Sequence, residues 1–378
     1  ETIEQSIVIE TDKMIKIDLA MNPAALSLSS VQIQAHRSFS AASSRSIRQF
    51  DMKTRPAPSS QDLLMLAPGL IIAQHAGGGK AEQIFMRGFD ADHGTDVAIS
   101  VDGLPVNMVT HGHGQGYADL HFLIPEVVEN IDVYKGPYFS QFGDFATAGA
   151  VQLGTVDHPE NNIVKIEGGV YNTGELTTVL KIPTSSVHQS AYFASQFYTT
   201  DGPFESPQNF NRFNVFGKFH THFSIKSELA FSMGSFSSAW DASGQIPTRA
   251  VNERLISRFG AIDDMEGGVT SRTNYSVLYE YGKGTNNEFT IQGYSSWYNF
   301  KLFSNFTYFL LDSVNGDMIE QTDSRSISGI NSKYIVRSAI GNILTKTTVG
   351  GGLRADNINV GLWKSPDRIR DIQYRDDF

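Results

Sequence analysis

The chain has 378 residues with 40% hydrophobic content, which is enough apolar material for more than one folded domain. Its formal net charge of -10 and its lack of a basic run argue against nucleic acid as a partner, because a polyanion needs a basic face. The absence of cysteine excludes thiolate catalysis, disulfides and cysteine-based zinc sites. The 34 glycines, 25 phenylalanines and 14 tyrosines favour β-structure.

A membrane-spanning helix is excluded by the distribution of apolar residues. No apolar run reaches the length of about 18 residues that a spanning helix needs, and the most apolar stretch, residues 63–73, is interrupted by Pro68-Gly69. Any insertion into a membrane must therefore use a β-barrel. Because no signal peptide begins at Glu1, we expect a mature or truncated chain.

Residues 1–46 predict the end of one domain and a connecting segment. Residues 1–24 contain short apolar blocks that are typical of strands. Residues 25–46 contain one alternating segment, Leu26 to Ala35, and then a serine-rich tail. A lone alternating segment of this kind is a candidate for addition to the edge of a partner's sheet, and an ordinary edge strand is the alternative.

Residues 47–157 predict a compact α+β domain. A short helix begins with capping residues at Ser59 and ends at Pro68-Gly69. A second helix is predicted from Pro125, because proline suits a first turn and the glutamates that follow suit the positive end of the helix dipole. Strand-like runs closed by glycine make up the rest, at residues 84–90, 97–107 and 125–137.

From residue 158 to residue 378 the chain consists of alternating, aromatic-rich segments separated by turns. In one of them Phe289, Ile291 and Trp297 share one face, whereas Gln292 and Ser296 share the other. Aromatic residues near strand ends resemble the interfacial girdles of outer-membrane barrels, and a soluble β-sandwich with one packed face is the alternative. The predicted strands cover residues 163–171, 175–182, 189–199, 211–221, 224–235, 273–282, 287–299, 331–337 and 344–350.

The length of this region decides what kind of barrel it can form. A barrel that holds a domain of about one hundred residues has about 22 strands, and strands of roughly 9–11 residues each use ~220 residues before any loop is counted. Residues 236–270 and 300–330 are long and non-repetitive. We therefore expect a mainly β protein in which a small α+β plug domain, residues 47–157, lies inside an antiparallel transmembrane β-barrel, with residues 158–378 supplying only its N-terminal part.

Four ordered motifs resemble the plug domain of TonB-dependent outer-membrane receptors. They are an opening helix and turn at residues 60–70, an Arg-Gly strand at 86–89, a strand and turn at 101–106, and an element with a basic-Gly-Pro ending at 127–137. Residues 143–154 resemble the exit from the plug into the barrel. Residues 1–24 resemble the end of the carboxypeptidase-regulatory-like β-sandwich that precedes the plug in many Bacteroidetes receptors.

The resemblance implies a location and a mechanism. The protein would lie in the outer membrane of a Gram-negative bacterium, in contact with membrane lipid, and the plug would be accessible from the periplasm. A scarce ligand would bind at the extracellular top of the plug, while the energy-transducing protein TonB would pair with a short periplasmic segment. The residues in the place of that coupling segment are Ser30, Val31, Gln32, Ile33, Gln34 and Ala35.

The resemblance also implies how the plug is held. In the family, the arginine of the Arg-Gly strand and the basic residue before Gly-Pro face acidic residues on the barrel wall, and Arg87 and Lys135 occupy these places. Lysine lacks the bidentate fork of arginine, so the second contact would be the weaker one. Glu167 or Glu228 are the expected partners.

A histidine-rich loop from Thr110 to Asp119 supplies the candidate ligands. His111 and His113 alternate along the extended chain, and their imidazoles suit zinc, copper, nickel or iron, so this pair is the candidate metal site. Hydrogen bonding within turns is the alternative for such glycine-flanked histidines. His220 and His222, in a later strand, are interpreted as a feature of the wall or a turn. The full candidate set at the plug apex is Asp92, His93, Asp96, His111, His113, Tyr117 and Asp119.

These features predict a transporter and not an enzyme, because the sequence has no serine elbow, phosphate loop or HExxH helix. The predicted function is energised uptake of a metal ion or a metal chelate such as a siderophore, with no resident cofactor. Uptake of an oligosaccharide or other organic nutrient is the first alternative, with aromatic residues such as Tyr117 and Trp240 at the top of the plug. The second is a subunit that binds a surface lipoprotein or another assembly protein and transports nothing.

Overall fold

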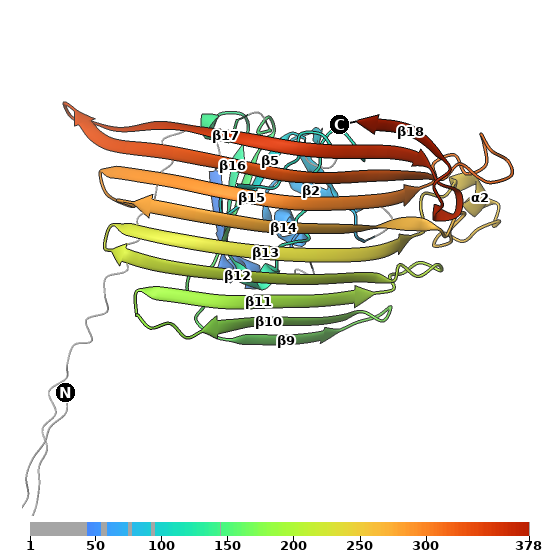
Figure 1. Cartoon of the computed structure of the whole chain (residues 1–378), viewed down its shortest axis with the longest axis horizontal. Coiled ribbons are helices and arrows are strands. Elements are labelled where there is room, and N and C mark those ends of the chain that lie inside the picture. Colours follow the sequence, from blue (N-terminus) through green and yellow to red (C-terminus); the bar gives the residue numbers. More distant parts are fainter. Residues whose placement is uncertain (1–43, 54–58, 75–77, 92–94, 144, 378) are drawn as a thin grey trace, which may run out of the picture. The chain divides into compact units, whose positions relative to one another are not determined.

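The computed structural model describes residues 44–53, 59–74, 78–91, 95–143 and 145–377. We call residues 44–157 the plug and the ten-stranded sheet that follows them the wall. The plug lies against one face of the wall (Figure 1). The predicted strands within residues 1–35, the coupling segment Ser30 to Ala35 and the candidates Asp92 and His93 lie outside the described residues.

The plug contains a five-stranded sheet of order β1-β7-β8-β5-β6 and a three-stranded sheet of order β2-β3-β4. Buried aliphatic side chains such as Ile84, Val97 and Ile131 give it a hydrophobic core of its own. Its strands are β1 (Ser44–Arg48), β2 (Leu70–Ala73), β3 (Gln83–Met86), β4 (Phe89–Ala91), β5 (Val97–Val101), β6 (Leu104–Pro105), β7 (Val128–Lys135) and β8 (Gly149–Thr155). Its helical turns are α1 (Gln49–Lys53), η1 (Asp62–Leu66), η2 (Pro125–Val127) and η3 (Ser140–Phe142).

Two hairpin turns explain the glycines of the plug motifs. In the β3–β4 turn, Arg87 has φ 55° and Gly88 has φ 80°, and in the β5–β6 turn, Asp102 has φ 48° and Gly103 has φ 78°. Positive φ at both central residues is the requirement of a type I′ turn, in which glycine carries no steric penalty. The Arg-Gly and Asp-Gly pairs therefore close two-residue hairpins.

Two local predictions for the plug are wrong, and a third is confirmed with a different helix type. The helix predicted from Pro125 is only the single turn η2, because Ile131 and Val133 alternate into the core and the chain continues as β7. The short helix predicted between Ser59 and Pro68-Gly69 is present as the 3-10 helix η1. Residues 44–46, predicted to belong to a flexible linker, pair with β7 as part of β1, which buries the side chain of Ile47.

The wall is one antiparallel sheet in which the strands follow chain order (Figure 1). Several strands are longer than predicted and extend into residues 236–270 and 300–330, so the interpretation of these stretches as non-repetitive is wrong. The wall strands are β9 (Ile163–Gly168), β10 (Gly174–Ile182), β11 (Gln189–Thr200), β12 (Phe210–Ser224), β13 (Ser227–Ala242), β14 (Glu266–Tyr281), β15 (Asn287–Ser304), β16 (Ile319–Ile340), β17 (Ile343–Lys364) and β18 (Ile372–Asp377). Helices α2 (Thr248–Asn252) and η4 (Pro366–Arg368) lie in its connections.

The connections between wall strands differ in length at the two ends of the sheet. Residues 225–226 and 341–342 join neighbouring strands by tight turns at one end, whereas residues 243–265 and 305–318 join them by long loops at the other. Figure 1 shows α2 at the long-loop end, on the right. Outer-membrane barrels have short periplasmic turns and longer extracellular loops, which gives the two ends of this sheet different expected environments.

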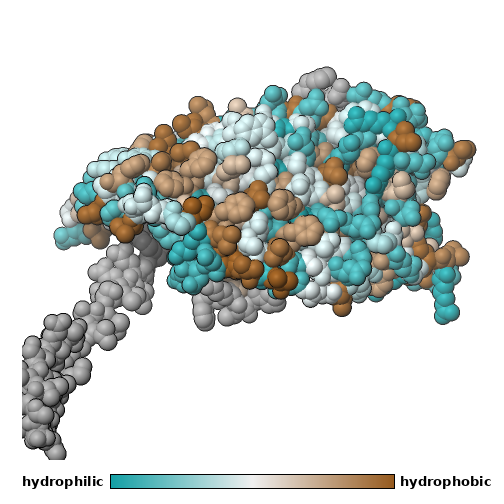
Figure 2. All heavy atoms as spheres, turned by 60° about the horizontal axis from the view of Figure 1, so that its bottom comes forward, coloured by the Kyte–Doolittle hydropathy of each residue, from teal (hydrophilic) through white to brown (hydrophobic). Residues whose placement is uncertain are grey.

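The exposure of the two faces of the wall distinguishes a barrel from a soluble β-sandwich, the two folds that the alternating pattern allows. Trp297 is 50% exposed and Val277 45% exposed, whereas Gln292 and Ser296 are buried on the face toward the plug. In a soluble β-sandwich the apolar face would be covered, so the alternation observed here is that of a barrel with a polar interior. Hydrophobic side chains also gather in brown patches on the surface drawn in Figure 2.

The mainly β fold class, with a plug and an antiparallel sheet of barrel strands, is confirmed. Among the described residues, no helix has the length and apolar composition to cross a membrane.

Candidate functional site

The wall holds the plug through basic side chains on its inner face. Lys218 on β12 lies 3.2 Å from Asp102 and 2.7 Å from Asp157, and it donates to the hydroxyl oxygen of Thr155 at 2.9 Å. Closer to the start of the wall, Lys165 on β9 lies 2.7 Å from Glu126 of the plug. In each of these ion pairs the wall supplies the cation and the plug supplies the anion.

Two wall arginines bind backbone carbonyl groups of the plug. Arg272 on β14 is buried and donates to the carbonyl oxygens of Pro105 at 3.1 Å and Val106 at 3.3 Å, while its guanidinium lies 4.8 Å from the centre of the Phe122 ring. Arg354 on β17 donates to the carbonyl oxygen of Asn107 at 2.9 Å. The chain after the β5–β6 hairpin is therefore held by guanidinium groups of two wall strands.

This arrangement differs from the predicted lock. Arg87 occupies a hairpin turn with its side chain exposed, and a Cβ added at Gly136 would lie 2.6 Å from its Nη1 atom, so it faces the turn after Lys135. Glu167 binds Lys165, and Glu228 binds Lys283. The choice of these two glutamates as partners of the lock is wrong, because both are neutralised by lysines of the wall itself.

The histidine loop packs against the wall near the long-loop end. The ring of His111 stacks on that of Tyr117 with 4.0 Å between centroids and meets the edge of Phe300 at 4.8 Å. Its Nδ1 accepts the backbone N–H of His113 at 3.1 Å, so in a neutral ring the proton is on Nε2, which lies 3.1 Å from the hydroxyl of Tyr298. Both ring nitrogens of His111 therefore have partners within the protein.

Backbone groups of the same loop are also bound by the wall. Gly112 donates its N–H to Asp323 on β16 at 2.9 Å, and its carbonyl oxygen accepts from Gln321 at 3.0 Å. Nδ1 of His113 lies 3.1 Å from Oε1 of the same glutamine. Asp323 is buried and also accepts from Nε of Arg325 at 2.7 Å, so its charge is compensated on the wall. Both the N–H and the carbonyl oxygen of Gly112 are therefore hydrogen-bonded to side chains of β16.

Two further candidates, Tyr117 and Asp119, are buried. Tyr117 is fully buried, and burial together with the charge of Asp119 raises its pKa well above the ordinary value. Asp119 accepts the backbone N–H of His121 at 2.8 Å and lies 2.8 Å from Nδ1 of that histidine. Burial raises the pKa of the Asp119 carboxyl, but the charge and hydrogen bonds of His121, with Arg272, lower it by more, so its pKa lies below the ordinary value.

The structure therefore divides the predicted ligand set. His111, Tyr117 and Asp119 are buried among protein groups in this arrangement, and their role as ligand contacts stays a prediction. His113 and Asp96 are half-buried. The metal pair of His111 and His113 also stays a prediction, and in this arrangement Nδ1 of His111 accepts a hydrogen bond from the backbone of His113.

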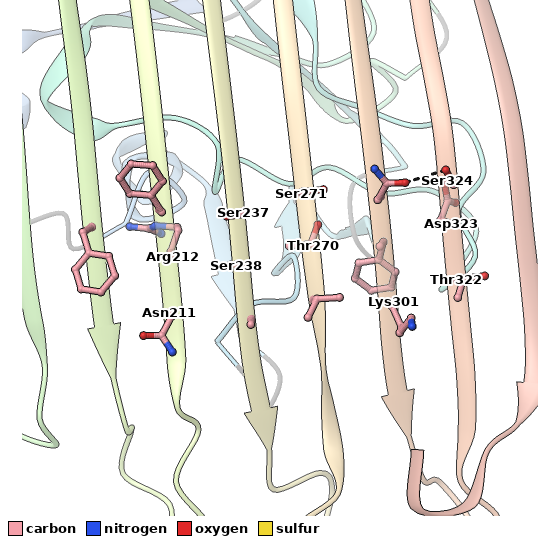
Figure 3. Close-up of a pocket in the computed structure, with 16 residues that line it drawn as sticks. Asn211, Arg212, Ser237, Ser238, Thr270, Ser271, Lys301, Thr322, Asp323 and Ser324 are labelled. Carbon is pink, nitrogen blue, oxygen red and sulfur yellow. Dashed lines mark hydrogen bonds between the residues drawn. The ribbon is translucent and has the colours of Figure 1, made fainter. Parts of the chain in front are cut away.

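A hollow of about 590 Å³ lies beside the wall contacts of the histidine loop (Figure 3). Its lining runs across neighbouring strands from β11 to β16, with the labelled Arg212, Thr270 and Asp323 among the residues that form it. Asp323 and Phe300 belong both to this lining and to the contacts of the loop.

Sequence reasoning missed the wall residues that hold the plug. Lys218, Arg272 and Arg354 are basic residues within alternating strands, and each has at least one polar neighbour two residues away, namely His220, Thr270 and Asp356. That placement on the wet face was the available signal, since a cation facing a barrel interior needs an acceptor there.

Comparison with known proteins agrees with this architecture. The model of the TonB-dependent Receptor Plug Domain matches residues 37–150. Vitamin B12 transporter BtuB of Vibrio vulnificus (strain CMCP6) is 27% identical over 130 residues, which cover 34% of this chain and 20% of the relative.

Solved structures extend the similarity to the wall. The ferric citrate transporter FecA, in the unliganded form, superposes with a TM-score of 0.73 at 15% identity and covers 89% of this chain and 51% of its own. The siderophore receptor PirA from Acinetobacter baumannii has a TM-score of 0.62 at 15% identity, over 84% of this chain and 48% of its own. The chain thus spans about half the length of these structures. Residues 37–150 thus match the plug domain of TonB-dependent receptors, and the fold of the chain is similar to that of these transporter and receptor structures.

Proposed function

We propose that the full-length protein takes up a metal ion or a metal chelate such as a siderophore through the outer membrane, driven by TonB. The observation that carries this proposal is the plug itself, which is bound to the inner face of the wall by Lys218, Arg272, Arg354 and Gln321. A ligand can pass such a domain only after these contacts are rearranged, which requires energy from outside the protein.

The choice of cargo is supported by what the similar proteins are named for. They include a vitamin B12 transporter, a ferric citrate transporter and a siderophore receptor. All three names describe a bulky metal chelate or its receptor, and a scarce nutrient of that size favours tight capture before transport. None of these proteins is named as an enzyme.

The ligand would meet the plug at the long-loop end. His113 and Asp96 are half-buried plug groups that remain from the predicted set, and Asp92 and His93 complete the proposed contact surface. Because the histidine loop is bound to Gln321 and Asp323, a ligand that displaces His113 from Gln321 would weaken one of the contacts that hold the plug. Binding outside could in this way prepare the plug for movement.

Force would enter through the segment Ser30 to Ala35, which precedes the first plug strand. Its alternating sequence suits pairing with the edge of a partner sheet, the mode by which a short segment can transmit a pull through backbone hydrogen bonds. The strand that follows, β1, is the edge strand of the larger plug sheet and pairs with β7. A pull on residues before β1 would therefore act directly on the larger plug sheet.

The proposal is tested by uptake in a host that lacks its own receptors for iron chelates. Radiolabelled ferric citrate, a ferric hydroxamate siderophore and cyanocobalamin serve as probes. We expect TonB-dependent accumulation of at least one iron chelate. Deletion of residues 30–35 should abolish accumulation and preserve binding at the cell surface, whereas deletion of residues 20–25 is the length-matched control. Accumulation that persists in a host without TonB, or no accumulation of any of these probes, would contradict the proposal.

A further inference from the structure

Three histidines meet at the short-turn end of the wall, far from the histidine loop. His220 and His222 project from the same face of β12, and His158 belongs to the link between the plug and β9. One nitrogen from each ring can be chosen so that all three lie within 4.8 Å of one another. The rings of His220 and His158 have centroids 5.0 Å apart, and those of His220 and His222 lie 4.7 Å apart.

A carboxylate completes this group. Oε2 of Glu228 on β13 lies 3.4 Å from Nε2 of His220 and 3.5 Å from Nδ1 of His222. In a tetrahedral zinc site with bonds of about 2.0–2.1 Å, two ligand atoms are about 3.4 Å apart. Oε2 therefore already has the spacing of a ligand next to both histidines, while Oε1 is bound by Lys283 at 2.9 Å. A second partner of this kind fixes the orientation of a metal-binding carboxylate.

His220 is the most enclosed member of the group. It is 3% exposed, and its Nε2 atom faces Oε2 of Glu228, so Nε2 is the nitrogen that would coordinate an ion. Its Nδ1 atom is buried without a hydrogen-bond partner among the described residues. His158 is exposed and His222 is half-buried, so an ion could reach the group from the surface.

The group also adjoins a cavity at the boundary between plug and wall. This cavity has a volume of about 220 Å³, and its lining includes His220 and Glu228 from the wall with Asp102 and Thr155 from the plug. The same boundary contains Lys218, which binds Asp157, the residue next to His158. The histidine group thus lies where the chain leaves the plug and enters the wall.

We propose that His158, His220, His222 and Oε2 of Glu228 bind one divalent transition-metal ion of the zinc class. Three imidazoles and one carboxylate form a donor set that zinc accepts in tetrahedral geometry. The bound ion would fasten the link at residue 158 to strands β12 and β13. This site is resident and separate from the transported ligand, and it does not depend on the proposed uptake function.

The test measures metal binding by the full-length protein purified in detergent and stripped with a chelator. Zinc chloride is titrated with metal content as the readout, and cobalt(II) replaces zinc so that its visible absorption reports tetrahedral coordination. The wild type should bind one zinc ion per chain. His158→Ala and His220→Gln should each weaken the affinity at least about tenfold and remove the tetrahedral cobalt spectrum.

A control variant separates this site from other histidines. His188→Ala removes an exposed histidine from the same end of the wall. It should bind zinc as the wild type does. Because His158 is exposed, its substitution leaves the fold intact, so unchanged zinc affinity in His158→Ala and His220→Gln would overturn the proposal. Equal loss in His188→Ala would also overturn it, since binding would then be adventitious. Chelate uptake can succeed or fail independently of either result.

Discussion

The ammonium nitrogen of Lys218, on wall strand β12, lies 3.2 Å from Oδ2 of Asp102 in the β5–β6 turn of the plug. The side chain of Lys218 is 6% exposed and that of Asp102 is 17% exposed, so the pair is largely withdrawn from water. Asp102 also accepts the backbone N–H of Thr155 at 2.8 Å. Lys218 therefore connects the β5–β6 turn with the end of β8 and with Asp157, which follows β8.

Lys218→Met should loosen the plug at this end. The substitution leaves Asp102 and Asp157 without their shared cation, and removing one partner of a buried ion pair costs about 3–5 kcal/mol. Hydrogen exchange of the purified protein should become faster in residues 101–105 and 153–157. Lys226→Met, at an exposed turn residue near the same end, is the matched control. Unchanged exchange in Lys218→Met would show that this network does not hold the plug.

Gly112→Ala should detach the histidine loop from β16. A Cβ at this position would lie 2.4 Å from the backbone carbonyl oxygen of Thr322, a contact that requires the loop or the strand to move. Overpacking of this kind costs about 1–3 kcal/mol, and here it would also break the hydrogen bonds of Gly112 with Asp323 and Gln321.

Limited proteolysis is the measurement for this variant, with cleavage expected to rise within residues 109–117. Gly114→Ala is the control, because a Cβ at Gly114 would have no atom within 4 Å. If the two variants are cleaved at the same rate, the close approach of Gly112 to the wall is not what orders the loop.

Glu82→Gln should remove a pH dependence of plug stability. Burial, with the nearby charges of Asp62 and Asp119, raises the pKa of the Glu82 carboxyl to about 8, from 4.5 in the unfolded chain. Between these two pH values the unfolded carboxyl is ionised while the folded one keeps its proton. The contribution of the Glu82 carboxyl to the free energy of unfolding is therefore fully present below about pH 4.5. It decreases as the pH rises and stops decreasing above about pH 8.

The apparent melting temperature at pH 5.5 and pH 8.5 measures this effect. Glutamine imitates the neutral carboxyl, so Glu82→Gln should melt higher than the wild type at pH 8.5 and should show a smaller difference between the two pH values. Glu129→Gln, an exposed residue of β7, is the control for loss of one carboxyl. A wild-type protein that melts equally at both pH values, with no gain in the variant, would contradict the prediction.

The sequence was sufficient for the fold class because alternation is a local property. Trp297 and Gln292 could be assigned to opposite faces from spacing alone, yet which face met water or lipid required the plug to be seen against the wall. The partners of His111 could not be predicted for the same reason. Tyr298 lies 187 positions later in the chain, and no short-range pattern connects the two residues.

The histidine group at the short-turn end illustrates the same limit. From the sequence alone, His220 and His222 are interpreted as a feature of the wall or a turn. His158 and Glu228 come from separate segments, and only the pairing of β12 with β13 and the position of the link bring them together. The spacing of His220 and His222 within β12 indicates two ligands on one face, but it does not indicate His158 or Glu228 as the other two ligands.

Arg272→Lys should fail to replace the arginine that binds the β5–β6 region. Arg272 reaches the carbonyl oxygens of Pro105 and Val106 with two different nitrogens of one planar guanidinium, and the same plane lies over Phe122. The compact ammonium of lysine cannot reproduce this fork, and a buried carbonyl left without its donor costs about 1–3 kcal/mol. Both Arg272→Lys and Arg272→Met should therefore speed hydrogen exchange in residues 104–108.

Arg337→Met provides the matched control, because Arg337 binds Glu288 on the wall at 2.6 Å and has no role in holding the plug. Full protection of residues 104–108 in Arg272→Lys would mean that charge alone, and not the forked geometry, fastens this part of the plug. Loss of protection in both Arg272 variants, with none in Arg337→Met, would locate the fastening at the guanidinium. In the proposed uptake mechanism, a pull on the plug would then have to break that contact before a ligand could pass.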